Sequence, residues 1–227
     1  MKDNGDEYRN FKASLNWSSS TLNRGLFPTR GRSRSASLEM TIPFSDLTFY
    51  KLDYKEQVFF PLTESFTLRL RGELGYGDNY GGSDGLPFYE NFFAGGFGSV
   101  RGFKQNTLGP QSTPSPFDPY TQQGQPFGGN TLIEGGAEII FPLPFIKDGR
   151  SMRPVFFVDA GNVFNSNCPC VSTVCDDVDL NLLRYSVGFS LTWITGMGPM
   201  TFGIAKAYNY DDTDNTEFFQ FELGRTF

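Results

Sequence analysis

The sequence predicts an all-β protein, namely part of an antiparallel transmembrane β-barrel with one long extracellular loop folded into the lumen. Segments of about ten residues alternate apolar and polar side chains along most of the 227 residues. Aromatic residues make up 16% of the chain and charged residues only 19%, which fits lipid-facing side chains diluted by polar lumen-facing ones. No run of about 18 apolar residues occurs, so no membrane-spanning helix is expected.

Composition alone fits a soluble β-sandwich equally well, and the segment near 66–77 favours the barrel. Phe66, Leu68 and Leu70 share one face of this segment with Leu74 and Tyr76. The opposite face carries three charged residues, Arg69, Arg71 and Glu73. Charges are rarely buried unpaired in a packed core, whereas a water-filled lumen accommodates them.

Nine strands follow from the same two-residue period. They are expected near residues 8–18, 32–43, 47–61, 66–77, 131–142, 152–164, 183–194 and 200–209, and from the acidic loop 211–215 to the end of the chain. The apolar faces include Phe11, Ala13, Leu15 and Trp17 in the first strand, Ala36, Leu38, Met40 and Ile42 in the second, and Tyr50, Leu52, Tyr54, Val58 and Phe60 in the third. Later strands present Ile133, Ala137, Ile139 and Phe141, then Phe156, Val158 and Ala160, then Tyr185, Val187, Phe189, Leu191 and Trp193, then Phe202 and Ile204.

The connections between these strands differ in length. Those at 62–65 and 194–199 are short, while those at 78–130 and 165–181 are long. Short turns on one rim and long loops on the other are typical of an outer-membrane barrel.

The net charge of −6 and the absence of a prominent basic tract argue against a nucleic-acid partner. The chain contains no histidine, which excludes a Ser-His-Asp triad, a Cys-His pair and a histidine-ligated metal site. We therefore predict neither an enzyme nor a cofactor. The polar start of the chain does not resemble a secretory signal peptide, so for an outer-membrane protein the signal is expected upstream.

Three cysteines, Cys168, Cys170 and Cys175, fall in the long connection 165–181. Cys168 and Cys170 are too close to bond each other easily, so a disulfide between Cys175 and one of them is expected, and the third thiol stays unassigned. A metal site is the weaker alternative because few ligand-type residues lie close together.

Arg101 is the most informative single residue. It lies in the glycine-rich stretch 92–103, between Val100 and Gly102-Phe103. A solvated loop arginine is the simple alternative, but the apolar neighbours do not suit an exposed loop tip. A guanidinium inside a lumen needs carboxylates, which it can bind through two parallel hydrogen bonds. The inward faces of the fifth and sixth strands offer Glu138 and Asp159, with Glu134 and Glu73 as further candidates. Replacing Arg101 with alanine is expected to leave Glu138 and Asp159 without a cation.

The chain ends on an alternating strand with aromatic residues, Phe219, Phe221, Leu223 and Phe227. One interpretation is a recognition signal that an assembly machine reads by edge pairing. The other is that the strand simply ends there.

Several of these motifs resemble the BamA (outer-membrane protein assembly factor, or bacterial surface antigen) family. The resemblance lies in Val100-Arg101-Gly102-Phe103, in the preceding segment 87–96, in 23–29, in 156–163 and in the aromatic C-terminus, and it covers residues 1–227. It implies the C-terminal part of a sixteen-stranded barrel that follows periplasmic POTRA domains, with a loop arginine that contacts Glu138 and Asp159.

The resemblance also implies a function. Family members fold and insert other barrels into the bacterial outer membrane through a barrel that opens sideways, without nucleotide or metal. The implied partners are the lipid bilayer, unfolded outer-membrane proteins and assembly-complex lipoproteins. Because nine strands cannot close a sixteen-stranded barrel, N-terminal strands or a second copy are expected to complete it. The alternatives are an export pore of the same superfamily and an inactive surface-structural remnant.

Overall fold

The computed structural model describes residues 9–81, 85–112, 124–143, 151–166 and 178–224. Nine strands form one antiparallel sheet in which every strand pairs with its neighbour in sequence. The strands are β1 (Lys12–Ser20), β2 (Gly31–Thr41), β3 (Phe49–Pro61), β4 (Thr67–Asn79), β5 (Thr131–Ile140), β6 (Met152–Phe164), β7 (Arg184–Thr195), β8 (Gly198–Tyr208) and β9 (Phe219–Leu223). The predicted all-β fold is confirmed. Among the described residues, no helix has the length and hydrophobicity needed to cross a membrane.

The strand ends differ from the predicted ones by a few residues. The first strand starts at Lys12, because Arg9 and Phe11 instead bond the 42–48 connection through Asp46 and Ser45. Strand β8 starts two residues early, at Gly198, because the turn from β7 is tight and Thr195 Oγ1 donates to the Gly198 carbonyl at 2.8 Å. Strand β9 covers only Phe219–Leu223.

The two faces of the sheet separate apolar from polar side chains. Leu15, Leu74 and Phe156 point outward and are each more than half exposed. Glu138 and Asp159 point inward and are 2% and 0% exposed. Since the outward face is rich in large apolar side chains and the inward face holds charges, the sheet has the polarity of a membrane barrel wall.

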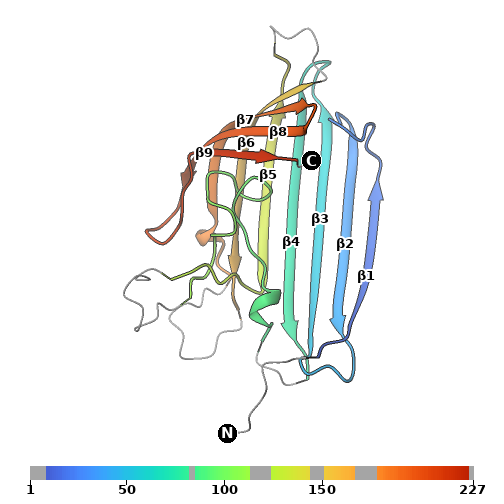
Figure 1. Ribbon diagram of the computed structural model, residues 1–227. Coiled ribbons are helices and arrows are strands. Elements are labelled where there is room, and N and C mark those ends of the chain that lie inside the picture. Colours follow the sequence, from blue (N-terminus) through green and yellow to red (C-terminus); the bar gives the residue numbers. More distant parts are fainter. Residues whose placement is uncertain (1–8, 82–84, 113–123, 144–150, 167–177, 225–227) are drawn as a thin grey trace.

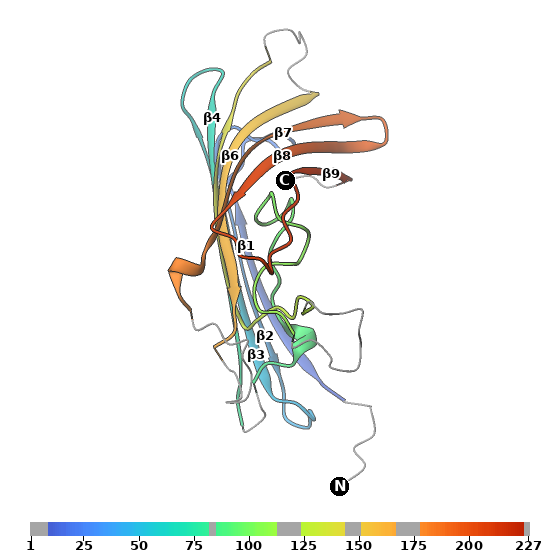
Figure 2. The same cartoon turned by 90° about the vertical axis from the view of Figure 1, so that its left-hand side faces the viewer.

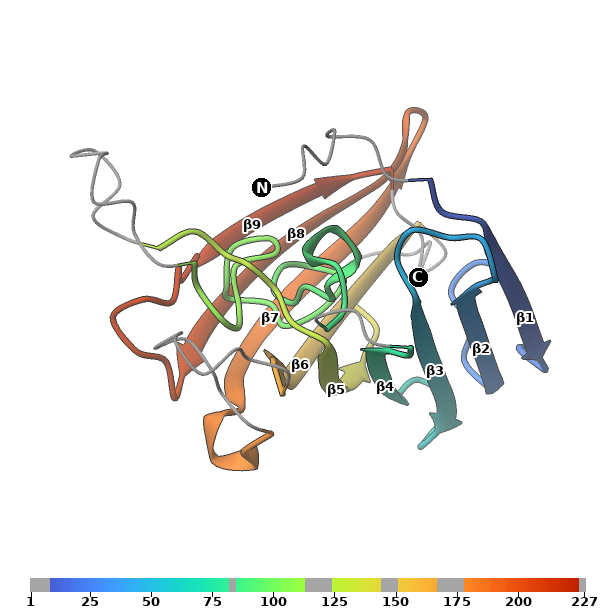
Figure 3. The ribbon, with the colours of Figure 1, turned by 90° about the horizontal axis from the view of Figure 1, so that it is seen from below.

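The sheet curves but does not close. Strands β1 and β9 lie at its two ends in the strand order, and no pairing joins them among the described residues. Seen from below, the strands trace an open arc, and the connection between β4 and β5 lies inside it (Figure 3). Turns β1–β2, β3–β4 and β7–β8 lie along the top edge in Figure 1, opposite the long connections.

The long connection lies against the concave face of the sheet (Figure 2), and the main hydrophobic core is formed by residues of both. A short 3-10 helix, η1 (Phe88–Glu90), lies near the start of the connection. The core consists of loop residues packed on strand residues: Phe92, Ala94, Val100, Phe103 and Leu108 from the connection, with Leu132, Val163 and Ala207 from β5, β6 and β8. Residues 92–108 of the connection are therefore a packed part of the fold.

Candidate functional site

The loop that carries Arg101 turns sharply on its glycines. Gly95, Gly96 and Gly102 all have positive φ angles, between 88° and 107°, a conformation that other residues rarely adopt. A Cβ on Gly102 would also lie 3.1 Å from the Ala205 side chain and 3.3 Å from that of Ser186. Glycine is thus needed at 102 both for the turn and for the close approach to β7 and β8.

The structure brings Arg101 together with both predicted carboxylates. Its Nε donates to Asp159 Oδ2 at 2.7 Å, and its Nη2 donates to Asp159 Oδ1 at 2.9 Å and to Glu138 Oε1 at 2.7 Å. The backbone N–H of Arg101 also donates to Asp159 Oδ2, at 3.3 Å. The guanidinium lies 3.5 Å from the centre of the Phe157 ring, which adds a cation–π contact.

Arg101 keeps its positive charge although its side chain is buried. Burial alone would lower the pKa of Arg101, but Asp159 and then Glu138 outweigh it, so the pKa lies above its usual value. The guanidinium therefore stays protonated, and its side chain is only 3% exposed. Such a buried cation requires its partners, because an unpaired charge in a dry site is strongly destabilising.

Two further arginines, which sequence reasoning did not assign to the site, share the same carboxylates. Arg69 Nη1 donates to Glu138 Oε2 at 3.0 Å, and Arg71 Nη2 donates to Asp159 Oδ1 at 2.9 Å. The expectation that Arg101 is the sole cation for these acids is therefore wrong. We call Arg69, Arg71, Arg101, Glu138 and Asp159 the arginine cluster.

The register of the sheet explains why Arg71 reaches Asp159 across a whole strand. Arg71 pairs with Gly136 on β5, and Gly136 pairs with Asp159 on β6. A Cβ on Gly136 would lie 2.4 Å from Asp159 Oδ1 and 3.1 Å from Arg71 Nε. The missing side chain at 136 thus leaves the space in which the ion pair forms.

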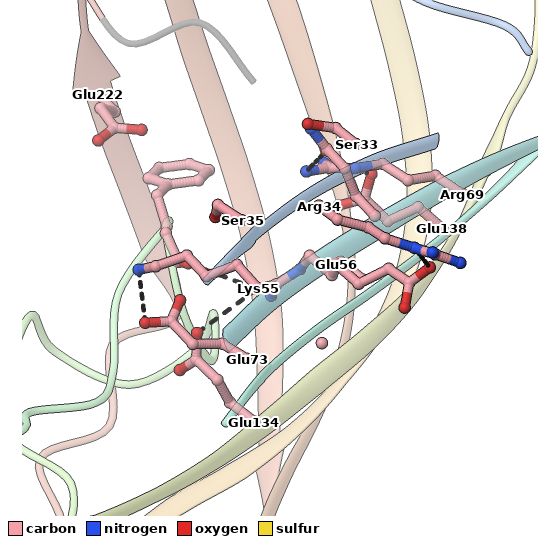
Figure 4. Close-up of a pocket in the computed structure, with 15 residues that line it drawn as sticks. Ser33, Arg34, Ser35, Lys55, Glu56, Arg69, Glu73, Glu134, Glu138 and Glu222 are labelled. Carbon is pink, nitrogen blue, oxygen red and sulfur yellow. Dashed lines mark hydrogen bonds and ion pairs between the residues drawn. The ribbon is translucent and has the colours of Figure 1, made fainter. Parts of the chain in front are cut away.

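The two further candidate acids have different positions. Glu134 borders the site: it accepts a hydrogen bond from Ser99 Oγ, and its Oε1 lies 3.9 Å from Arg71 Nη1. Glu73 lies outside the cluster and pairs with Lys55 at 2.5 Å. Both face a polar cavity of about 280 Å³, in which Glu222 of β9 lies opposite β3 and β4 (Figure 4).

Arg71 also holds the loop through its backbone. Its guanidinium donates to the carbonyl oxygens of Gly98, at 3.4 Å, and of Ser99. Arg71 of the wall, which is paired with Asp159, therefore also bonds the loop backbone. The loop and the wall are thus joined by one side chain from each, Arg101 from the loop and Arg71 from the wall.

The motif also contacts the last strand. Gln220 of β9 accepts from the Gly102 N–H at 3.2 Å and donates to the Phe103 carbonyl at 2.7 Å. Just before β9, Phe103 and Thr216 form an antiparallel bridge, and Glu217 N–H donates to the Gly102 carbonyl at 2.8 Å. Residues 101–103 of the motif are therefore bonded to the middle of the sheet and to its C-terminal end.

A second group of charges holds the start of the loop. Glu90 of η1 bonds Lys12 of β1, and Lys51 Nζ of β3 donates to the Glu90 carbonyl at 2.7 Å. Lys12 also pairs with Glu39 of β2 at 2.9 Å. We call Lys12, Glu39, Lys51 and Glu90 the root group.

The other predicted residues are placed as follows. Phe219, Phe221 and Leu223 of β9 are exposed, at 56%, 49% and 55%. Phe227 and the three cysteines, Cys168, Cys170 and Cys175, lie outside the described residues. The described residues contain no group of three or more metal-ligating side chains.

Comparison with known proteins identifies the family. The model of the Omp85 superfamily domain matches residues 1–227. The outer membrane protein assembly factor BamA of Neisseria meningitidis is 35% identical over 96% of this chain, which covers 29% of that protein. The mouse sorting and assembly machinery component 50 homolog is 30% identical over 64% of this chain and 30% of its own length.

A solved structure agrees with these matches. The crystal structure of BamA from Haemophilus ducreyi lacking POTRA domains 1–3 superposes with a TM-score of 0.81 and 33% identity, over 96% of this chain and 42% of that one. The chain thus spans about three tenths of the length of these curated relatives. Its fold and its relatives place it in the bacterial outer membrane. The chain belongs to the Omp85 superfamily and, within it, to the barrel part of the BamA family.

Proposed function

We propose that this chain serves as barrel wall and lumenal latch in an outer-membrane β-barrel assembly factor, which folds and inserts other barrel proteins. The observation that carries the proposal is the seating of Arg101 on Asp159 and Glu138, which fixes the long loop against the concave face. Membership of the BamA family supports the same function. Its relatives are named as assembly factors and assembly-machinery components, which favours a non-enzymatic role.

The open edges of the sheet suggest how such a wall would work. Every residue of β1 is exposed, and β1 and β9 each have one edge without a strand partner among the described residues. Unpaired backbone groups are not tolerated in lipid. We infer that N-terminal strands, or a second copy, pair with these edges, and that sideways opening offers an edge to an unfolded substrate strand.

The latch, that is, the loop bonded through Arg101, would keep the strands of the wall in place while the barrel opens sideways. Gln220 ties β9 to the motif, and Arg101 ties the motif to β5 and β6. Movement of the last strand would then be resisted by the loop rather than by strand pairing alone. Unfolded outer-membrane proteins are the proposed substrates, and lipoproteins of an assembly complex are further proposed partners.

A reconstitution experiment tests the proposal. The full-length protein is placed in lipid vesicles, and folding of a urea-denatured barrel protein is followed by its heat-modifiable gel mobility. We expect faster folding than in empty vesicles and a marked loss with Arg101→Ala. Little change is expected with Lys55→Gln, which removes a lumenal cation whose ion pairs among the described residues are with Asp53 and Glu73 of the wall. Failure of the unaltered protein to bind substrate or accelerate its folding would contradict the proposal.

An export pore is the second candidate, and the polar cavity beside the loop favours it. In that case the protein would carry a partner polypeptide across the vesicle membrane without accelerating barrel folding. An inactive surface-structural protein would do neither. The same vesicles, loaded with protease to detect cargo entry, distinguish the three outcomes.

A further inference from the structure

The hairpin between β1 and β2 concentrates positive charge. It carries Arg24, Arg30, Arg32 and Arg34, and no acidic residue occurs from 24 to 34. The arginines are separated by one to five other residues, so they do not form a continuous basic run. The hairpin geometry brings them to one corner of the sheet, at the rim of the short turns (Figure 1).

Internal hydrogen bonds hold the turn of this hairpin in one conformation. Asn23 Oδ1 accepts from the backbone N–H groups of Thr29 and Arg30, at 3.1 and 3.2 Å. Its Nδ2 donates to Thr29 Oγ1 at 3.0 Å, and its backbone N–H donates to the Arg30 carbonyl at 3.1 Å. The backbone that displays the arginines is therefore held in one shape before any ligand binds.

Two of the arginines lie on the lipid-facing side of the sheet. Strand β2 pairs with β3 in unbroken register from Gly31 to Met40. Arg32 and Arg34 therefore share a face with the exposed, outward Leu38 and Met40. Arg34 Nε pairs with Glu56 at 2.8 Å, and both side chains are about one third exposed.

Arg24 and Arg30 lie on the inner side of this rim, where they line a cavity with Glu64 and the inward Arg153. Arg24, Arg30 and Arg32 are exposed. The structure records no side-chain hydrogen bond or ion pair for them within the described part of the chain. Short turns of an outer-membrane barrel face the periplasm. Of these three cations, Arg32 thus lies where the barrel surface meets the headgroups of the periplasmic leaflet, and Arg24 and Arg30 lie at the inner side of the same rim.

We propose that the β1–β2 hairpin binds the phosphate group of anionic phospholipids in the periplasmic leaflet. Arginine forms paired hydrogen bonds with phosphate oxygens, and a cation near an anionic leaflet contributes about 1 kcal/mol of attraction. Acidic protein segments would suit the charge, but they do not explain why Arg32 and Arg34 lie on the apolar, bilayer-facing side. This site would exist whether or not the chain assembles other barrels.

Native mass spectrometry of the full-length protein in detergent tests the site. Dioleoylphosphatidylglycerol and dioleoylphosphatidylcholine are added separately, since they share acyl chains and differ in charge. The unaltered protein should bind the anionic lipid more tightly. The triple variant Arg24→Gln, Arg30→Gln, Arg32→Gln should lower this preference at least fivefold, the equivalent of about 1 kcal/mol for one cation, while the Arg34–Glu56 pair stays intact.

Lys206→Gln is the matched control, because Lys206 is an exposed cation of β8 near the opposite rim. It should leave the lipid preference unchanged, and unaltered heat-modifiable mobility would show that the triple variant is folded. Equal binding of both lipids by the unaltered protein would overturn the proposal, as would an equal loss with Lys206→Gln. Binding of a polyglutamate peptide or of inorganic phosphate, without preference for the anionic lipid, would also overturn it and would identify a protein or free-phosphate site instead.

Discussion

The same loop is held by two groups of charges that differ in their exposure to water. In the arginine cluster, the side chains of Arg101, Glu138 and Asp159 are 3%, 3% and 0% exposed. In the root group, those of Lys12, Lys51 and Glu90 are 35%, 24% and 15% exposed. The centre of the arginine cluster is therefore shielded from water, while Arg69 and Arg71 at its edge are 9% and 13% exposed and the root group is partly solvated.

This difference in exposure indicates which of the two groups of contacts determines the loop conformation. A dry ion pair has a large desolvation cost and is stable only with complete hydrogen bonding, so it tolerates one geometry. A wet pair contributes little and tolerates several geometries. We therefore expect the arginine cluster to fix the loop and the root group to favour the position of its first turn.

Arg101→Ala should have the largest effect on stability. Removing one partner of a buried pair costs about 3–5 kcal/mol. Here the loss should lie near the lower end, about 3 kcal/mol, because Arg69 and Arg71 remain bonded to Glu138 and Asp159. The denaturant midpoint and heat-modifiable mobility of the full-length protein measure this loss.

Lys55→Ala is the control for this change, since Lys55 is 53% exposed and pairs with Glu73 of the neighbouring strand β4. Its effect should stay within about 0.5 kcal/mol. Equal losses for the two variants would mean that burial does not distinguish the arginine cluster from an ordinary lumenal pair.

Much of this architecture could be predicted from sequence because its signals are local. Alternation over a few residues defines each strand, and an arginine between Val100 and Gly102 requires carboxylates inside the wall. Glu138 and Asp159 could be selected because they are inward acids on consecutive strands. The role of the loop as a latch stays a prediction.

The remaining contacts depend on register and on distant segments. Arg71 reaches Asp159 only because Gly136 lies between them, and this alignment is set by the pairing of three strands. Glu90 meets Lys12, which is 78 residues away in sequence. Alternation shows which face Arg71 and Lys12 occupy, but it carries no information on what lies opposite them.

Gly136→Ala should have an intermediate effect and tests the geometry of the dry cluster. The new methyl group would overlap Asp159 Oδ1 at 2.4 Å, so the Arg71–Asp159 pair must shift. Overpacking of this kind costs about 1–3 kcal/mol. Gly72→Ala on β4 is the matched control, because a Cβ there meets only the Glu134 carbonyl oxygen, at an ordinary 3.6 Å. The denaturant midpoints of both variants measure the difference, and equal values would show that the space at Gly136 does not matter.

Glu90→Gln should have the smallest effect and the strongest dependence on salt. Partly exposed ion pairs contribute about 0.2–1 kcal/mol, and the screening length falls from about 10 Å at 0.1 M salt to about 3 Å at 1 M. The variant should therefore be less stable than the unaltered protein at low salt and nearly equal to it at 1 M. Arg101→Ala should lose the same stability at both salt concentrations, because its partners are shielded from solvent ions. Denaturant unfolding of both variants at the two concentrations measures this contrast. A salt-independent loss with Glu90→Gln would mean that the root group is as dry as the arginine cluster, and that the loop has two rigid attachments.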